Sequence, residues 1–562
     1  MVFQPGLLDP ENVMSIQETS QDNWPFPHII IQDAIKDSFL RQVRDEINGN
    51  LPFKFDENNV YRIQRSTNLA NISNPEEFQL GLLPGLIQLR DALYSFKFRK
   101  WVSRITAVGP LSGTKSSMAV NLYTPGGHLL VHDDCNPNSK NRRVSYILYL
   151  TDPDNPWQLE WGGGLRLYAS EPKRNANGHD VKLTLPQWSK NIQPCFNQLI
   201  FFAIQPGGTY HEVEEVRYSG DMVVDQDRRR MAVSGWFHTA QEGDEGFDEA
   251  IQQAEMQRVE HLHQLKATVH EFHEPQTIFT SFDHVEMDGP GANGILSRQD
   301  IDYLSYYLAP QLLTRARIDQ MSEYFSRTSM LQLSPFLCEH FAIKLKDYIT
   351  TFNHRYGKTN EQSNTPSEWK TARPPEAHRY LYLDNSAGPL FQATPISQLI
   401  TCLLRSHAFK KWLALATGFA LSNINKQHVI ARRFRRGLDY ILADAHDKRR
   451  PQLDYTLSIT PVNCNHASRY GAGETSGEEI YMSTEHDAIQ LMFAGRNFTR
   501  TLKDGTGYKN PISWNSFSAI LRCDGMQSFV KYVSHEASGD RWDIKGKVQL
   551  KGHMLDGVTS HQ

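Results

Sequence analysis

Hydrophobic and polar positions alternate over short segments through much of the first half of the chain. These segments fall within residues 117–239 and include MAVNLYTPGG, HLLVHDD, RRVSYILYLT, WGGGLRLYAS, NQLIFFAIQPGG and RRMAVSGWFHT. Glycine, proline and asparagine separate them, which is typical of turns between strands. Short alternating strands with frequent turns predict an antiparallel sandwich or barrel.

Helical patterning flanks these strands. Residues 24–50 predict an entry strand followed by an amphipathic helix, and residues 84–101 predict a second helix. From residue 296 to residue 356 helical patterning dominates again, and β-like segments return after a polar loop at 357–376. The expected fold class is therefore mainly β with flanking helices (α+β).

The length of the chain and a change in its character predict more than one domain. With 562 residues, the chain is too long for a single hydrophobic core. After His238 the sequence becomes acidic, polar and glycine-containing, which is typical of a linker. We expect one domain over residues 1–240, an acidic linker with some helix over 241–300, and a helical segment with a second β domain over 301–562.

The second half of the chain repeats features of the first. FRKW reappears as FKKW, and RMAVSGWF from Arg230 falls on RWDIKGKV from Arg541, an offset of 541 − 230 = 311 residues. NQLIFFAI from Asn197 likewise resembles NSFSAILR from Asn515. Several matches in the same order favour duplication of one β fold over chance similarity between two β-rich halves.

Composition narrows the class of protein. Hydrophobic residues make up 39% and charged residues 22%, which excludes global disorder, and a net charge of −4 argues against a general nucleic-acid binder. The six cysteines form no CxxC pair, no stretch approaches the ~18 apolar residues of a membrane span, and the first residues lack the pattern of a secretory signal. We therefore expect a protein of the cytoplasm and nucleus with reduced thiols and no membrane contact.

The segment HLLVHDD carries the first candidate ligands of a metal. His132 and Asp134 lie two residues apart, and on a strand such side chains point to the same face. His211 follows the apolar segment LIFFAI and a PGG turn, where a returning strand would bring it across the barrel. Two histidines and one carboxylate on one face of a metal leave three positions open, which suits non-haem iron(II). Zinc is the competing ion, although it usually prefers four ligands.

An arginine follows the third candidate ligand. Arg230 lies 230 − 211 = 19 residues after His211, at the start of a predicted strand. Its planar guanidinium can form two parallel hydrogen bonds to a carboxylate, as a 2-oxoglutarate co-substrate requires, and Tyr149 could donate its hydroxyl to the same group. An HxD pair alone is usually structural, but the later histidine, the arginine and the intervening strands together favour a metal site.

The order HDD, RRVSYILYL, WGGGLRLY, FFAI, a histidine and R-x-x-x-S-G-W-F-H resembles the ribosomal prolyl-hydroxylase family of 2-oxoglutarate/iron(II) oxygenases. LSRQDIDYLSYYLAPQLL and SMLQLSPFL resemble the middle region of that family. The resemblance covers most of residues 24–550 and is strongest over 117–238. It implies two double-stranded β-helix (jelly-roll) domains, of which only the N-terminal one is catalytic.

The resemblance also implies roles for individual residues. His132, Asp134 and His211 would bind Fe(2+), Arg230 would join them in catalysis, and Arg230 and Tyr149 would hold 2-oxoglutarate; ascorbate would be a further cofactor. The implied substrate is a proline of a ribosomal small-subunit protein at the decoding centre, oxidised with molecular oxygen. Effects on translation accuracy or termination, and on oxygen-dependent regulation, would follow.

The second copy lacks the candidate ligands. At the offset of 311 residues, Ala443 stands for His132 and Ala445 for Asp134. Alanine offers no lone pair to a cation, so we expect this domain to be non-catalytic and to bind a partner or brace the first domain. The segment ARRFRRG at 431–437 is basic, and a solvated face is favoured there over contact with the ribosome or RNA.

Motifs for a metal and a co-substrate do not specify the substrate, so two alternatives stay open. One is an oxygenase that acts on another protein residue, as a lysyl hydroxylase or a demethylase does. The other is a protein that senses oxygen mainly by binding a regulator, with turnover secondary. An intact set of ligands favours an enzyme.

Overall fold

The computed structural model describes most of the chain: residues 2–71, 80–135, 141–283, 295–356, 368–384, 394–445, 452–461, 477–482, 506–522 and 526–551. The chain divides into two compact units. The first comprises Met1–His273 with Arg373–Glu376, and the second comprises Glu274–Ala372 with Ala377–Gln562. The division after His273 falls inside the stretch 241–300, whose role as a linker stays a prediction.

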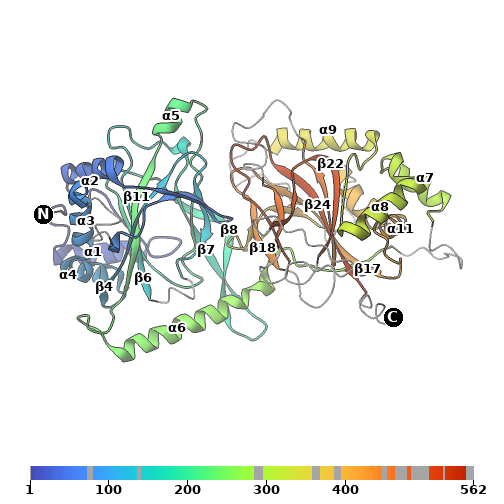
Figure 1. Ribbon diagram of the computed structural model, residues 1–562. Helices are drawn as coiled ribbons and strands as arrows, with labels where there is room; N and C mark the ends of the chain where they lie inside the picture. Colours follow the sequence, from blue (N-terminus) through green and yellow to red (C-terminus); the bar gives the residue numbers. More distant parts are fainter. Residues whose placement is uncertain are drawn as a thin grey trace, which may run out of the picture. The chain divides into compact units, whose positions relative to one another are not determined.

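The first unit is built on one curled antiparallel sheet with the strand order β1-β9-β6-β11-β4-β3-β5-β10-β7-β8, and β2 pairs with β3. Its strands are β1 (Ile29–Ile31), β2 (Lys54–Glu57), β3 (Tyr61–Arg65), β4 (Leu111–Tyr123), β5 (His128–His132), β6 (Arg142–Tyr149), β7 (Leu165–Arg174), β8 (Asp180–Ile192), β9 (Leu199–Ala203), β10 (His211–Val213) and β11 (Arg230–Thr239). Its α-helices are α1 (Pro10–Gln21), α2 (Asp37–Asn50), α3 (Pro84–Leu93), α4 (Phe96–Thr106), α5 (Met222–Asp227) and α6 (Glu249–Ala267). In Figure 1 the helices α1 to α4 lie together on one side of this sheet.

Helix α4 shows why the first helices cover the sheet. Ser95 caps its start by accepting a hydrogen bond from the backbone N–H of Phe98. Phe98, Trp101, Val102 and Ile105 follow at helical spacing, and each is at most 3% exposed. Burial of an apolar side chain of this size contributes about 1.5–3 kcal/mol, so this face of the helix holds it against the sheet.

The second unit contains two sheets, with the orders β13-β22-β19-β24-β17-β16-β14 and β15-β18-β23-β20-β21, and β12 pairs with β17. Its strands are β12 (Thr280–Ser281), β13 (Met330–Leu333), β14 (Lys370–Thr371), β15 (His378–Arg379), β16 (Leu381–Leu383), β17 (Ile424–Phe434), β18 (Tyr440–Ala445), β19 (Gln452–Ile459), β20 (Glu479–Met482), β21 (Thr506–Asn510), β22 (Trp514–Arg522), β23 (Gln527–Val530) and β24 (Arg541–Leu550). Its α-helices are α7 (Arg298–Ser305), α8 (Arg315–Thr328), α9 (Glu339–Tyr356), α10 (Pro395–Gln398) and α11 (His407–Thr417).

The two units share one strand order. The run β1-β9-β6-β11-β4 recurs as β13-β22-β19-β24-β17. The register recurs as well, since Arg230 lies opposite Tyr123 in the first unit and Arg541 lies opposite Phe434 in the second. The repeated order and register support the predicted duplication, and the mainly β, jelly-roll fold class is confirmed.

A buried asparagine recurs at the same place in each unit. Asn197 has a φ of 61°, and its side chain accepts a hydrogen bond from the N–H of Ile35 at 2.9 Å and donates one to the carbonyl of Ile35 at 2.6 Å. Asn515 has a φ of 54° and makes the corresponding bonds to the backbone of Leu337. Asparagine suits this position because it tolerates the left-handed conformation and satisfies two buried backbone groups.

The basic segment 431–437 is only in part the solvated face that its composition favours, since Arg436 is exposed but Arg432 and Arg433 are not. Arg432 is buried and bonds both oxygens of Asp543, at 2.7 and 3.1 Å, and Arg433 is buried against Asp540. Burial is tolerated because each guanidinium meets a carboxylate from a strand or turn about 100 residues later.

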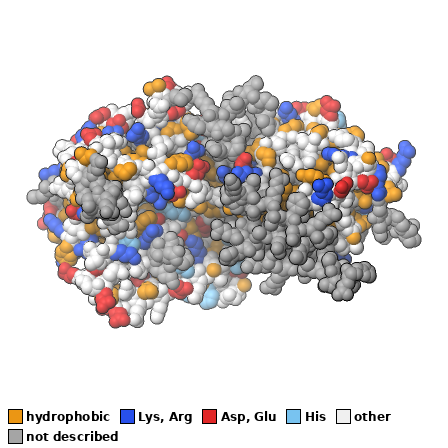
Figure 2. Space-filling view, in the orientation of Figure 1, with side chains coloured by type: hydrophobic (Ala, Val, Ile, Leu, Met, Phe, Trp, Pro, Cys, Tyr) orange, Lys and Arg blue, Asp and Glu red, His pale blue; other side chains and the backbone are white. Residues whose placement is uncertain are grey.

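The surface carries charges of both signs. On the face shown in Figure 2, acidic and basic side chains are interspersed among hydrophobic ones. Among the helices that the structure describes, none has the length and hydropathy needed to cross a membrane.

The buried asparagine turn gives a first testable prediction. Asn197→Ala should lower the free energy of unfolding of the first unit by about 2–4 kcal/mol, because it leaves the backbone groups of Ile35 unsatisfied and forces alanine into a left-handed conformation. Scanning calorimetry of the full chain measures the loss. Asn515→Ala should produce a loss of similar size in the transition of the second unit. A change below about 0.5 kcal/mol in both variants would show that the turns do not depend on asparagine.

Candidate metal and co-substrate site

The pairing of β5 with β10 brings two histidines face to face. His132 is the last residue of β5 and His211 is the first of β10, and the two are direct partners in the antiparallel register. Their ring centroids are 4.3 Å apart. Asp134 follows two residues after His132, so it points to the same side of the chain.

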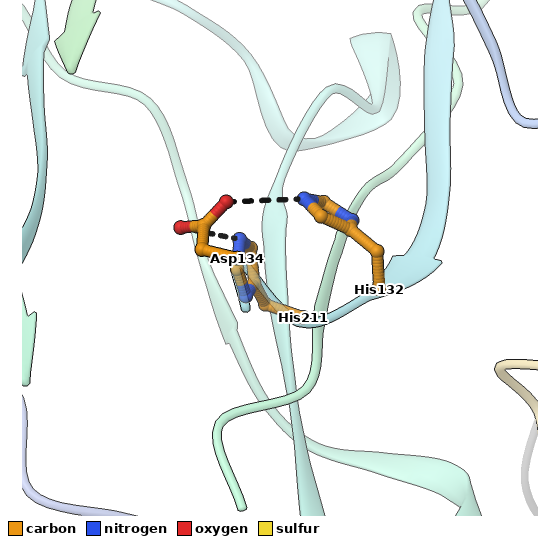
Figure 3. A group of neighbouring side chains, drawn as sticks. All are labelled: His132, Asp134 and His211. Atoms are coloured by element: carbon orange, nitrogen blue, oxygen red, sulfur yellow. Dashed lines mark ion pairs between the residues drawn. The ribbon is translucent and has the colours of Figure 1, made fainter. Parts of the chain in front are cut away.

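The three side chains converge on one point, as Figure 3 shows. Nε2 of His132 lies 3.9 Å from one carboxylate oxygen of Asp134, and Nε2 of His211 lies 3.8 Å from the other. One donor atom from each residue lies within 4.8 Å of the other two. Asp134 and His211 are buried, whereas the side chain of His132 is 23% exposed, so the site opens on the side of His132.

Backbone carbonyls set the orientation of both imidazoles. Nδ1 of His132 lies 2.8 Å from the carbonyl of Leu130, and Nδ1 of His211 lies 3.0 Å from the carbonyl of Thr209. A carbonyl only accepts, so each Nδ1 donates, and in the neutral ring each Nε2 keeps its lone pair for the site. Burial, and then the neighbouring His211, lower the pKa of His132 to about 4, which keeps that ring neutral at neutral pH.

The carboxylate of Asp134 is held in its charged form. Burial alone would raise its pKa, but the neighbouring His211 and His132, together with the hydroxyl of Ser145, hold the pKa below its ordinary value. The site therefore offers two imidazole nitrogens and one carboxylate oxygen on one side. This donor set fits iron(II) with three positions left open, whereas a closed four-ligand zinc site would need a further donor.

Arg230 begins β11 and is 1% exposed. Its Nε donates to the carbonyl of Gly163 at 2.5 Å, its Nη2 donates to the hydroxyl of Tyr149 at 3.1 Å, and its guanidinium lies 5.0 Å from the ring centroids of Tyr149 and Tyr123. Within the part of the chain that the structure describes, it forms no ion pair with a carboxylate. A buried cation is costly without an anion, so this arginine is suited to the carboxylate of a ligand.

Glycine is required beside the arginine. Gly163 has a φ of +71°, and a Cβ there would lie 3.0 Å from Cδ of Arg230 and 3.2 Å from the ring of Trp157. Any side chain would displace the guanidinium or the indole. The WGGG segment is therefore part of the packing around Arg230.

Two further residues border the site, and neither had a predicted role. Arg142 stacks over the indole of Trp236, with its guanidinium 3.5 Å from the ring centroid, and donates to the backbone carbonyl of Asp134 at 3.3 Å. Both side chains are half-exposed. The period of two along β11 places Trp236 on the same face as Arg230. This alternation could have predicted from the sequence that Trp236 borders the site.

The second unit has an arginine at the position equivalent to Arg230, and this arginine pairs with a carboxylate. Arg541 donates to the carbonyl of Gly477, as Arg230 does to Gly163, and Gly477 has a φ of +72°. In addition Arg541 bonds Asp543 at 2.8 and 2.9 Å. Carboxylates of the protein itself therefore neutralise this arginine.

The register also corrects the expected place of the ligands in the second unit. Asp444 lies opposite Ser528 there, at the position where His132 lies opposite His211. The counterpart of His132 is thus Asp444 and not Ala443, one residue later than the constant offset predicts, because the turn between β17 and β18 (435–439) is one residue longer than the turn between β4 and β5 (124–127). Ala445 is accordingly not the counterpart of Asp134; that counterpart, His446, lies outside the described residues.

Two family models match the chain. Residues 118–238 match the 2OG-Fe(II) oxygenase superfamily, and residues 299–556 match the family described as oxoglutarate and iron-dependent oxygenase degradation C-term. The first match contains all three converging side chains as well as Tyr149 and Arg230.

Curated relatives agree with these models. The chain is 29% identical over 549 residues to a prolyl 3,4-dihydroxylase OGFOD1 of Ostreococcus tauri, covering 92% of this chain and 94% of that protein. It is 34% identical over 218 residues to a prolyl 3-hydroxylase OGFOD1 of Xenopus laevis, covering 39% of this chain and 36% of that one. Among solved structures, a Pseudomonas putida prolyl-4-hydroxylase aligns over 40% of this chain and 98% of its own, with 18% identity and a TM-score of 0.28. The family models and the curated relatives together indicate the family of the chain.

The converging side chains give a second prediction. His132→Ala should weaken the binding of a divalent metal to the apoprotein by at least about 100-fold, because one of three donors is lost, while the fold stays intact. Titration with cobalt(II), followed by its visible absorption, measures the affinity, and circular dichroism checks the fold. His128→Ala, four residues earlier on β5, is the matched control. Unchanged cobalt affinity in a folded His132→Ala protein would reject the site.

Proposed function

Because this chain belongs to the iron(II)- and 2-oxoglutarate-dependent oxygenases, in the family of the OGFOD1 prolyl hydroxylases, we propose that it hydroxylates a proline of a small-subunit ribosomal protein at the decoding centre. The activity of the family is prolyl hydroxylation with oxygen. The ribosomal substrate is the more specific part of the proposal. The single observation that carries the proposal is the open-sided triad in a unit that also buries Arg230, for which the described residues provide no acidic partner.

Different residues of the first unit would bind the metal and the co-substrate. His132, Asp134 and His211 would hold Fe(2+), and Arg230 with Tyr149 would hold the distal carboxylate of 2-oxoglutarate. When bound, iron and 2-oxoglutarate supply the oxidising chemistry: one oxygen atom of O₂ enters succinate, carbon dioxide is released, and the other oxygen atom converts a C–H bond of proline to C–OH. The protein orients these groups and keeps water away from them.

The half-exposed side of the site would receive the substrate. Trp236 presents a flat apolar ring next to Asp134, and Arg142 lies against it with donors to spare for a peptide carbonyl. A proline ring is apolar and its preceding carbonyl is an acceptor, so the two side chains complement both parts of a prolyl peptide. This complementarity supports a protein substrate over a small free metabolite.

The proposal also includes a reductant, a location in the cell and a role for the second unit. Ascorbate would serve as a reductant that maintains iron(II), and the protein would act in the cytoplasm and nucleus. The second unit would contact the ribosome or its RNA, and hydroxylation would affect the accuracy or termination of translation and respond to oxygen. The ion pair of Arg541 with Asp543 supports a non-catalytic second unit, since this arginine is already neutralised by a carboxylate of the protein.

The role of Arg230 gives a third prediction. Arg230→Lys keeps the charge but loses the two-pronged donor, so the KM for 2-oxoglutarate should rise by about 10-fold or more while cobalt affinity stays unchanged. Arg229→Lys, at the exposed neighbouring position, is the control and should behave as the unaltered chain. An equal defect in both variants would place the co-substrate elsewhere.

The substrate proposal is tested by the product. The full chain, incubated with a proline-containing peptide from a small-subunit ribosomal protein, iron(II), 2-oxoglutarate and oxygen, should add about 16 Da to the peptide and release succinate in step. Replacing the proline of the peptide with alanine should abolish both. A mass increase on another residue would support an oxygenase of different specificity. Unchanged peptide mass, with regulator binding that survives in His132→Ala, would support an oxygen-sensing binding protein.

A further inference from the structure

The side chain of one lysine contacts the two residues that directly precede the candidate metal ligands Asp134 and His211 in the sequence. Lys266, near the end of α6, places its Nζ 3.0 and 3.1 Å from the two carboxylate oxygens of Asp133, and 5.2 Å from the ring centroid of Tyr210. Asp133 directly precedes Asp134 in the chain, and Tyr210 directly precedes His211. All of these residues belong to the first unit.

The carboxylate of Asp133 also joins the two ligand-bearing segments directly. Its side chain is 4% exposed and accepts a hydrogen bond of 3.0 Å from the backbone N–H of Gly207. Gly207 lies in the turn between β9 and β10, four residues before His211. Asp133 therefore ties the chain that carries Asp134 to the turn that leads into His211, and Lys266 neutralises its buried charge.

A second contact from α6 lies on the other side of Asp134. Sγ of Cys135 lies 3.4 Å from Nε2 of His263, one turn before Lys266 on the same helix. The helix thus contacts both sequence neighbours of Asp134. Apolar contacts add to this docking, since Val259, the one buried residue of α6, packs with Cys135 and Ile204, and Leu265 packs against the cluster that contains Val181. Polar and apolar contacts together therefore hold the helix.

The hydroxyl end of Tyr210 is also held, by a contact on the side away from Lys266. Its ring is 1% exposed and packs with Val131 and Tyr168, and its hydroxyl hydrogen-bonds the carboxyl group of Glu376. Glu376 in turn accepts a hydrogen bond from Thr184 at 3.2 Å. Glu376 belongs to the short segment Arg373–Glu376, which joins the first unit from far along the chain.

These contacts restrict the positions of two metal-binding side chains. A ligand set functions only when its members are held within about 0.5 Å of their productive geometry. Partners that orient metal ligands from outside the ligand set typically change metal affinity by about 10–100-fold when they are lost. Asp134 lies beyond the end of β5 and His211 begins the three-residue β10, so the ladder of backbone hydrogen bonds fixes them less firmly than residues inside long strands.

We propose that Lys266 is a positioning residue of the metal site, acting through Asp133 and Tyr210, and that α6 is a brace for the ligand-bearing segments. The inference rests on the proposed function, since it concerns the same metal. It assigns a role to a helix that composition alone predicts as part of a linker. Glu376 completes the brace from the side of Tyr210.

The test compares variants of the full-length apoprotein by cobalt(II) titration and by thermal unfolding without metal. Lys266→Met removes the charge at nearly constant length and should weaken cobalt binding by about 10-fold or more. Lys266→Arg should restore most of the affinity, because a cation again meets Asp133. Lys346→Met, at an exposed position of α9, is the matched control and should bind as the unaltered chain does.

A double-variant cycle tests the route through Asp133. Asp133→Asn should weaken cobalt binding by a similar factor, and Lys266→Met should add little in that background, because the interaction is already lost. Additive losses would overturn the proposal, as would cobalt affinity within about twofold of the unaltered chain in folded Lys266→Met. Failure of the unaltered chain itself to bind cobalt would overturn the proposed function and the inference with it, so the two failures are distinguishable.

Discussion

The antiparallel pairing of β5 with β10 is the contact on which the site depends. Side chains alternate along a strand with a period of two, so a slip of one residue would turn His211 away from His132. The pairing is flanked by β3 on one side and β7 on the other, and both neighbours extend beyond the short β10. Asp134 then needs only the two-residue spacing to join the histidines.

Buried charge explains how two copies of one fold come to differ. Both units keep an arginine at the start of the equivalent strand, bonded to the carbonyl of an equivalent glycine. Among the described residues Arg230 has no acidic partner, and an anionic ligand would offset the cost of burying this cation. The second unit supplies Asp543, so Arg541 is satisfied within the fold. One unit is therefore arranged for a ligand and the other for stability.

The sequence predicted what local periodicity and spacing determine. The alternation of short segments predicted an antiparallel sandwich or barrel, and the resemblance to a family implied the jelly roll. The order of HxD, histidine and arginine predicted the residues that the structure brings together. The repeat of Asn197 at Asn515 was visible as well, although its reason, a left-handed turn with two buried bonds, was not. These features depend on neighbours along the chain or on period-two strands.

Long-range contacts account for what the sequence did not predict. The turn between β17 and β18 is one residue longer than the turn between β4 and β5, so the counterpart of His132 is Asp444, and a constant offset does not allow for an extra residue in a turn. Arg432 is buried because Asp543 lies across the sheet from it. The composition of helix α6 is polar and acidic, and its contacts far along the chain, of Lys266 with Asp133 and of His263 with Cys135, show which segment it packs against.

The central claim is that one metal and one 2-oxoglutarate bind to the first unit alone. Calorimetric titration of the full-length apoprotein with 2-oxoglutarate, in the presence of manganese(II), tests it most directly. The account predicts one 2-oxoglutarate per chain, with binding lost in Arg230→Ala and retained in Arg541→Ala if that variant folds. A second binding event, or binding that survives in Arg230→Ala, would contradict it.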